Sequence, residues 1–150
     1  MPFSFRAAGI VGPFVQDNHS VSSPGTVRGL HFQREPHAQG KLVRVTRGRV
    51  WDVAVDLRMG SRSFGKWEGI ELSAANRLMF WIPVGFAHGF VALEEGTELQ
   101  YKCTDEYAPG SEGGIRWDDG GLAIDWPLRE AHVSEKDAAL PSFDPNGGYY

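Results

Sequence analysis

The sequence contains only one cysteine, Cys103, which excludes an intrachain disulfide framework. It also lacks an apolar run of about 18 residues, the length that predicts a membrane-spanning helix, and the N-terminal MPFSFRAAGI has no signal-peptide pattern. An excess of basic residues is missing as well, since the formal net charge is -4, and this argues against binding to nucleic acid. We therefore expect a protein of the reducing cytoplasm that binds neither nucleic acid nor membranes.

What the sequence does contain favours turns and strands. Its 150 residues include 19 Gly, 9 Pro and 9 Phe, and a chain of this length is expected to form one domain. Short segments of alternating polarity are separated by Gly, Pro and Asp, which predicts strands at 14–20, 26–33, 41–48, 49–58, 66–73, 78–83, 86–93 and 97–104. This spacing predicts an all-β sandwich or barrel that spans residues 1–150.

The connections between these segments predict two further features. Arg47-Gly48 has the composition of a turn, and we expect it to join 41–48 and 49–58 as a β-hairpin. Past Tyr107 the alternation is lost, and a short helix is predicted only after Ser134, where Ser-Glu-Lys-Asp supplies an N-cap and early acidic residues. The tail of the chain, from residue 141 onward, is predicted to be irregular.

Polar residues occupy strand positions whose neighbours on the same face are apolar. His88 and Tyr101 are predicted to point into an apolar interior, where a hydrogen-bonded structural role is the more common one for these residue types. Lys41 is harder to explain by packing, because it falls in phase with Val43 and Val45 and a buried ammonium is costly unless it is paired. A ligand-holding cavity inside an open barrel resolves this conflict, and we hypothesise a binding site there.

The same period of two assigns faces to other polar residues. His31 is predicted to share a face with Val27 and Gly29, and thus to be a further polar residue of the interior. Asp52 and Asp56 alternate with the apolar residues of their strand, and their spacing resembles that of paired catalytic carboxylates. We interpret them instead as a solvent-exposed strand face, which is the more common arrangement.

A short motif at 82–90, IPVGFAHGF, contains Pro-x-Gly-x-x-His and resembles the second motif of the cupins, which are small double-sheet jelly rolls. Metal-binding cupins also carry a His-x-His pair on an earlier strand, where this chain has His-Phe-Gln. His31, His37 and His88 could still hold a divalent ion together, so a metal-dependent cupin enzyme is the second hypothesis. The missing pair, and the repulsion of a cation by Lys41, favour a site without metal.

Longer motifs carry a much more specific resemblance over roughly residues 14–141. They are QDNHSVSSPGTVRGLHFQ, QGKLVRVTRGRVWDVAVDLRMGSRSFGKWE, PVGFAHGFVAL, YKCTDEYAPGSEGGIRWDD, LAIDWP and SEKD. Together they resemble the dTDP-4-dehydrorhamnose 3,5-epimerase family. The resemblance implies an all-β cupin jelly roll, here with short C-terminal helical segments, and a homodimer that needs no cofactor.

The activity implied by the resemblance is the inversion of C3 and C5 in a dTDP-4-keto-6-deoxyhexose, on the way to dTDP-L-rhamnose. Some relatives in deoxysugar pathways invert only C3 or only C5, so the sequence leaves the choice of carbon open. A non-catalytic jelly roll that binds sugar nucleotides is the third hypothesis.

The resemblance also assigns catalytic roles. His31, the histidine of RGLHFQ, resembles the family's base, and Asp137 of SEKD completes a His-Asp dyad with it. Tyr101, the first tyrosine of YKCTDEY, resembles the general acid, and Lys41 resembles the lysine near the C4 oxygen of the sugar. Such chemistry requires these groups, because a C–H bond beside a ketone is broken readily only when a base accepts the proton and a fixed donor stabilises the enolate.

Further residues resemble the family's contacts to the nucleotide and the sugar. They are Gln16, Asn18, Arg28, His88, Glu112 and Lys136, with Tyr107 in the place of the aromatic ring that stacks on thymine. Arg28 and Lys136 suit the diphosphate, because charge-assisted hydrogen bonds offset the cost of burying phosphate oxygens.

The N-terminal region departs from the family pattern. Members normally have a further segment before the QDN motif, with an Arg-Gly-x-Phe stretch that contacts the nucleotide and strands that pair in the dimer. In this chain only MPFSFRAAGIVGP stands there. We therefore expect the N-terminal strands of the family to be missing, a sheet edge to be exposed, and the dTDP-sugar to bind weakly.

Overall fold

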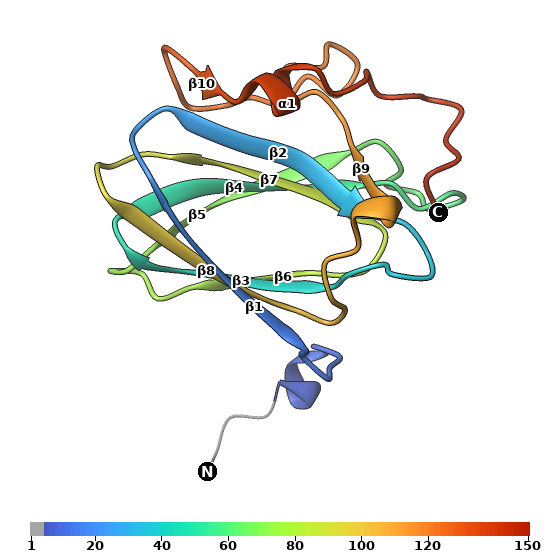
Figure 1. Ribbon diagram of the computed structural model, residues 1–150, viewed down its shortest axis with the longest axis horizontal. Helices are drawn as coiled ribbons and strands as arrows, with labels where there is room; N and C mark the ends of the chain where they lie inside the picture. The colour runs from blue at the N-terminus through green and yellow to red at the C-terminus, as the bar shows by residue number, and fades with distance from the viewer. Residues whose placement is uncertain (1–4) are drawn as a thin grey trace.

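The computed structural model of the protein describes residues 5–150, which form two β-sheets packed face to face (Figure 1). The smaller sheet has the strand order β1-β8-β3-β6, with bounds Gln16–Ser22, Thr97–Cys103, Lys41–Arg47 and Met79–Ile82. The larger sheet has the order β10-β2-β7-β4-β5, with bounds His132–Val133, Thr26–Gln33, Phe86–Ala92, Arg49–Asp56 and Trp67–Ser73. A further strand, β9 (Glu112–Gly114), pairs with β2. The described residues also contain the short helices η1 (Arg6–Ala8), η2 (Pro109–Ser111) and α1 (Glu135–Ala138), and within them no helix is long and apolar enough to cross a membrane.

The fold class predicted from the sequence is confirmed. Each of the eight predicted strands is present, and its bounds differ from the prediction by at most two residues. The predicted helix after Ser134 is α1, and the Ser134 hydroxyl accepts a hydrogen bond from the amide of Asp137 at 3.1 Å. Residues 141–150 form neither helix nor strand, as predicted. Local polarity and capping patterns were therefore sufficient to predict these elements, whereas the short elements β9, β10, η1 and η2 were not predicted.

The predicted hairpin at Arg47-Gly48 is wrong. β3 is hydrogen-bonded to β6 and β8 in the smaller sheet, whereas β4 is hydrogen-bonded to β5 and β7 in the larger sheet. Gly48 has a φ of 74° and turns the chain from one sheet to the other, directly against Thr97. A tight turn joins two strands equally well in a hairpin or at the corner of a sandwich, so the sequence signal did not distinguish them.

Two apolar cores lie on the two faces of the larger sheet. The core between the sheets contains Val43, Val45, Val50, Ala54, Leu72, Ile82, Phe90 and Leu99. The core on the outer face contains Leu30, Phe32, Val53, Val55, Leu57, Ala87, Ile115 and Leu122. The chain after β9 covers this outer face, and Figure 1 shows the segment lying over β2 and β7. Strands in the middle of the larger sheet are therefore buried on both faces.

Burial on both faces explains why the predicted solvent-exposed face of β4 is wrong. Asp52 and Asp56 are 0% and 2% exposed, because they point between the two sheets. Asp52 bonds to His88, whereas Asp56 accepts hydrogen bonds from Arg58 and Ser61 in the loop between β4 and β5. Burial alone would raise the pKa of Asp56, but the hydrogen bonds outweigh it and hold the pKa well below its ordinary value. Asp56 therefore ties this loop to the end of the sandwich.

A bulge in β2 changes the face assigned to His31. The register with β7 shifts between Arg28 and His31. Arg28 lies opposite Phe90, which packs in the core between the sheets. His31 lies opposite His88, two residues away from Phe90 on the same face of β7. His31 therefore shares the inner face with Arg28, and the prediction that it shares a face with Val27 is wrong.

Candidate active site

A cavity of about 250 Å³ opens between the two sheets, at the end where β2 ends and β3 begins. Seven of the eleven residues predicted for the site line it, namely Gln16, Asn18, His31, Lys41, Tyr101, Tyr107 and Glu112. The other four lie beside this set, namely Arg28, His88, Lys136 and Asp137. The sandwich therefore gathers side chains from β1, β2, β3, β8 and β9 that are far apart in the sequence.

Asp137 holds His31 in place at the wall of the cavity. The Nε2 atom of His31 lies 2.6 Å from Oδ1 of Asp137, and Oδ2 accepts a hydrogen bond from the amide of Gly29 at 3.0 Å. Burial alone would raise the pKa of Asp137, but the hydrogen bonds from His31 and Gly29 outweigh it and lower the pKa. The carboxylate therefore stays ionised beside the imidazole, and Nδ1 of His31 is the ring nitrogen left to exchange a proton with a ligand.

Lys41 lies in the same cavity, where residues 5–150 supply no anionic partner for it. The residue is 9% exposed, and among residues 5–150 its ammonium forms no hydrogen bond or ion pair. It lies 5.7 Å from the centroid of the Tyr101 ring. Burial lowers the pKa of Lys41, against the opposing effect of nearby groups that include Asp52 and Glu112. A buried cation of this kind is suited to stabilise negative charge that develops on a bound ligand.

Tyr101 projects from β8 into the same space. It lies opposite Asn18 of β1 and opposite Val43 of β3, which places its side chain on the inner face of the smaller sheet. Burial raises the pKa of Tyr101 above its ordinary value, so the phenol keeps its proton at neutral pH. This side chain is therefore suited to donate a proton.

Charged and aromatic side chains form a rim at the mouth of the cavity. The hydroxyl of Tyr107 donates to Oε2 of Glu112 at 2.8 Å, and Nζ of Lys136 lies 3.3 Å from the same oxygen. Burial alone would raise the pKa of Glu112, but the hydrogen bonds from Tyr107 and Lys136 outweigh it and lower the pKa. Lys136 directly precedes Asp137 in α1, so this short helix supports the rim and the His31–Asp137 dyad together.

The structure does not bring the three predicted imidazole ligands together. Residues 5–150 contain no group of three or more His, Cys, Asp or Glu side chains that could hold a metal ion. His37 lies beside Asp105 instead, with 3.6 Å between its Nδ1 atom and Oδ2 of the carboxylate. The arrangement of the described residues therefore gives no support to the metal-dependent hypothesis.

Comparison with known proteins places this site in a family. A family model described as dTDP-4-dehydrorhamnose 3,5-epimerase matches residues 3–145, which include every predicted site residue. The chain belongs to the dTDP-4-dehydrorhamnose 3,5-epimerase family.

Individual members of the epimerase family are similar in sequence and in structure. The dTDP-4-dehydrorhamnose 3,5-epimerase of Pseudomonas aeruginosa is 58% identical over 139 residues, which cover 92% of this chain and 76% of the relative. The crystal structure of the epimerase from Elizabethkingia anophelis has a TM-score of 0.90 and 51% identity, covering 97% of this chain and 80% of that chain. A dTDP-6-deoxy-D-glucose-3,5-epimerase from Legionella pneumophila, solved in complex with dTDP-4-keto-L-rhamnose, has a TM-score of 0.86 and 49% identity, covering 93% of this chain and 80% of that chain.

This member of the epimerase family also has a buried His-Asp pair that the sequence prediction missed. Nε2 of His88 lies 2.9 Å from each carboxylate oxygen of Asp52, and both side chains are buried. Burial raises the pKa of Asp52, against the opposing effects of His88 and Lys41. The available signal was the nearly continuous apolar run around Asp52 in β4, which is typical of a strand buried on both faces.

Some residues that resemble epimerase substrate contacts are already bonded within the protein. The side-chain oxygen of Gln16 accepts a hydrogen bond from the amide of Tyr107 at 2.7 Å, and its nitrogen donates to Asn18 at 3.1 Å. Nε of Arg28 donates to the hydroxyl of Ser22 at 3.2 Å, and the residue remains exposed. The structure therefore puts Gln16 in contact with a loop of the site, and leaves the charge of Arg28 accessible to a ligand.

Proposed function

We propose that this chain is an epimerase that inverts C3 and C5 of a dTDP-4-keto-6-deoxyhexose in the biosynthesis of dTDP-L-rhamnose. The observation that supports this most strongly is the arrangement of the His31–Asp137 dyad, Lys41 and Tyr101 around one cavity. Inversion beside a ketone requires a base, a donor that stabilises the enolate and an acid, and these side chains supply all three. The relatives named 3,5-epimerase, at 58% and 51% identity, support the choice of both carbons.

In the first half of each inversion, His31 accepts the proton of the C–H bond next to the C4 ketone. The electron pair of that bond forms an enolate, and negative charge develops on the C4 oxygen. Lys41 stabilises this charge by donating a hydrogen bond, while Asp137 stabilises the imidazolium. General base catalysis contributes roughly 10²–10⁴-fold and one oxyanion donor roughly 10²–10³-fold, so both groups contribute substantially.

In the second half, Tyr101 donates its phenolic proton to the same carbon from the opposite face. The enolate electrons form the new C–H bond, the ketone is restored, and the configuration of the carbon is inverted. Tyr101 then regains a proton from solvent and His31 releases one, which resets both groups for the second carbon. The raised pKa of Tyr101 supports this role, because the step needs the protonated phenol.

The nucleotide part of the substrate is proposed to bind along the rim. Tyr107 is 53% exposed, and its ring is proposed to stack on thymine. The diphosphate is assigned to the cationic side chains of Arg28 and Lys136. The remaining proposed contacts are Gln16, Asn18, His88 and Glu112. The relative solved with dTDP-4-keto-L-rhamnose supports a ligand of this class.

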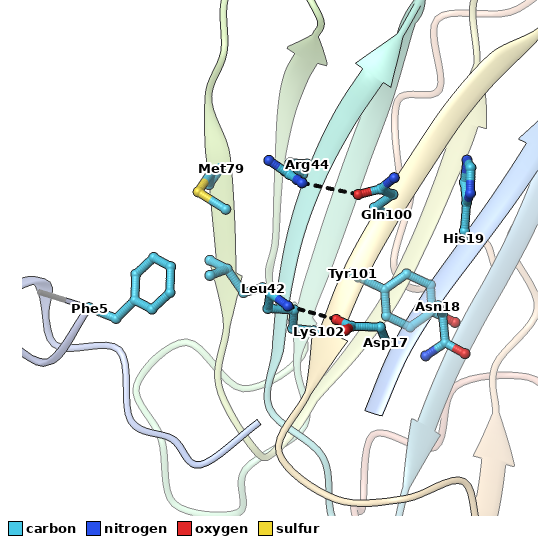
Figure 2. Close-up of a pocket in the computed structure, with 10 residues that line it drawn as sticks. All are labelled: Phe5, Asp17, Asn18, His19, Leu42, Arg44, Met79, Gln100, Tyr101 and Lys102. Atoms are coloured by element: carbon cyan, nitrogen blue, oxygen red, sulfur yellow. Dashed lines mark hydrogen bonds and ion pairs between the residues drawn. The ribbon is translucent and has the colours of Figure 1, made fainter. Parts of the chain in front are cut away.

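Two chains are proposed to associate through the outer face of the smaller sheet. Val21 and Met79 are 57% and 42% exposed on this face. Figure 2 shows Met79 and Leu42 at a hollow of about 440 Å³ in the same face. Burying such side chains against a second copy is favourable. We expect the mass of a dimer by light scattering, and a monomer at all concentrations would contradict the proposal. Residues 1–150 are proposed to be one domain, and the unpaired Cys103 supports a cytoplasmic location.

Exchange with heavy water tests the proposed function. A base that ionises C3 and C5 exchanges these protons with solvent, so the dTDP-4-keto-6-deoxyhexose is expected to gain deuterium at both carbons when it is incubated with the protein in D₂O. Nuclear magnetic resonance of the sugar locates the label. Label at one carbon alone would show a mono-epimerase, and no label at either carbon would contradict the epimerase proposal. A chain that binds dTDP without exchange would then be a binding protein. Loss of exchange after treatment with a chelator would favour a metal-dependent enzyme.

A further inference from the structure

The side chain of Gln33 forms hydrogen bonds to the loop that carries Tyr107. The side chain of Gln33 projects from the end of β2 and is 4% exposed. Its nitrogen donates to the carbonyl of Glu106 at 3.1 Å, and its oxygen accepts from the amide of Ala108 at 3.0 Å. Its second N–H donates to the carbonyl of His37 at 2.7 Å. Gln33 thus bonds to the residues on both sides of Tyr107 and to the loop between β2 and β3.

Two other glutamine side chains bind the backbone of the same loop. The oxygen of Gln16, from β1, accepts from the amide of Tyr107 at 2.7 Å. The nitrogen of Gln39, from the connection before β3, donates to the carbonyl of Asp105 at 2.8 Å. Side chains from separate parts of the chain therefore bind the backbone of each residue from 105 to 108, a segment that has no helix or strand of its own. We call Gln16, Gln33 and Gln39 the glutamine clamp.

The polar groups of the Gln33 side chain are all hydrogen-bonded within the glutamine clamp, although this side chain lines the cavity. Both amide hydrogens and the amide oxygen of Gln33 are bonded to backbone atoms, so the side chain has little left to offer a ligand. Tyr107, in contrast, is about half exposed as a residue, and within the described residues its hydroxyl bonds to Glu112. The clamp therefore fixes the backbone of the loop while the aromatic face stays open.

We propose that Gln33 is a positioning residue, which with Gln16 and Gln39 fixes Tyr107 at the mouth of the cavity and thereby sets the affinity for the pyrimidine nucleotide. This inference rests on the proposed function, in which Tyr107 stacks on the base. Binding immobilises an aromatic side chain, which costs conformational entropy. This cost is smaller when the loop that carries the side chain is already ordered before the ligand binds. Gln33 acts through the loop of Tyr107, because its polar groups bond to backbone atoms and none of them bonds to His31 or Asp137.

Replacing Gln33 with leucine tests the inference, because leucine keeps the volume and removes the three hydrogen bonds. The Kd for dTDP by calorimetry and the KM for the dTDP-sugar are each expected to rise about tenfold, while kcat changes by less than about threefold. Asn76→Leu is the matched control. The side chain of Asn76 also bonds to backbone atoms, namely the amides of Ser73 and Leu78 and the carbonyl of Glu71, and removing it is expected to leave the Kd unchanged.

Gln33→Glu provides a second variant in case Gln33→Leu fails to fold. An ionised glutamate still accepts from the amide of Ala108, but it has no proton for the carbonyls of His37 and Glu106 and repels both. Protonation restores one donor, so the Kd of this variant for dTDP is expected to approach the wild-type value as the pH is lowered toward 5. A merely structural substitution has no reason to recover in this way. A Kd that stays raised at every pH would contradict the inference.

A double-mutant cycle with Tyr107→Ala decides whether Gln33 acts through the ring. Gln33→Leu is expected to raise the Kd for dTDP in the wild-type background and to add less than about twofold when Tyr107 is already alanine. Equal effects in both backgrounds would overturn the inference, as would a fall in kcat with KM unchanged. Failure of the proposed function itself is distinguishable, because in that case the wild-type protein exchanges no deuterium into the sugar, even where it binds dTDP.

Discussion

Replacing His31 with asparagine is expected to reduce both epimerisation and deuterium exchange at C3 and C5 by roughly 10²–10⁴-fold, the contribution typical of a general base. Asparagine keeps a polar group near the carboxylate of Asp137, which lies 2.6 Å from the imidazole in the wild-type chain. An amide does not accept a proton at neutral pH, so the variant folds and still lacks the base. Nuclear magnetic resonance in D₂O measures exchange, and circular dichroism confirms the fold.

Two control variants separate the base from its neighbours. Asp137→Asn is expected to slow exchange and inversion together, because the imidazole loses the carboxylate that orients it. Tyr101→Phe is expected to retain exchange and to lose net inversion, because abstraction by His31 precedes donation by Tyr101. If His31→Asn exchanged deuterium at the wild-type rate, another group would have to be the base, and His88 with its buried Asp52 would be the first candidate.

The strands were predictable because their information is local. Alternation with a period of two marks a strand wherever one face is buried, and Gly, Pro and Asp mark the turns. The fold class followed from the number and spacing of these segments. The connection at Gly48 was not predictable in the same way, because the choice between a hairpin and a crossing depends on which strands pair at a distance.

Errors in the predicted faces have two physical causes. The chain after β9 covers the outer face of the larger sheet, so β4 has no solvent-exposed face and its polar residue Asp52 points between the sheets. A bulge in β2 shifts the phase of every residue after it, so His31 moved to the face of Arg28. The period of two along a single strand gives no information about a distant segment that covers the sheet, or about an extra residue at a bulge.

The residue patterns predicted that a site exists better than they predicted which residues belong to it. Lys41 was recognisable from the residues alone, because a cation in phase with Val43 and Val45 has no structural explanation. Asp137 entered only through the family resemblance, since it follows His31 by 106 positions and reaches it through a short helix. Gln33 was missed because its role depends on the backbone of a loop far along the chain, namely the carbonyl of Glu106 and the amide of Ala108.

The Lys41→Met variant is expected to lose roughly 10²–10³-fold in kcat, the effect of removing one donor to a developing oxyanion. Methionine fills much of the same volume without a charge, and the ammonium it replaces has no hydrogen bond or ion pair among residues 5–150. Burial lowers the pKa of Lys41 in the folded chain, so protonation of this side chain is less favourable there than in the unfolded chain. The protonated lysine therefore lowers the free energy of unfolding at neutral pH. The variant is therefore expected to be less active while its Tm is the same or higher. A loss of Tm in parallel with kcat would instead point to a structural role.

The pH dependence of exchange gives Lys41 a signature of its own. A lowered pKa means that Lys41 loses its proton, and with it the charge on the oxyanion donor, at a lower pH than an ordinary lysine with a pKa of 10.5. In the wild-type protein, the rate of deuterium exchange is therefore expected to fall as the pH rises, at a pH below 10.5. This fall is expected to be absent in Lys41→Met. Burial raises the pKa of Tyr101, and its phenol is not needed for abstraction, so Tyr101→Phe is expected to keep the same alkaline fall. If the fall disappeared in Tyr101→Phe and persisted in Lys41→Met, the charge that stabilises the enolate would have to come from a group other than Lys41.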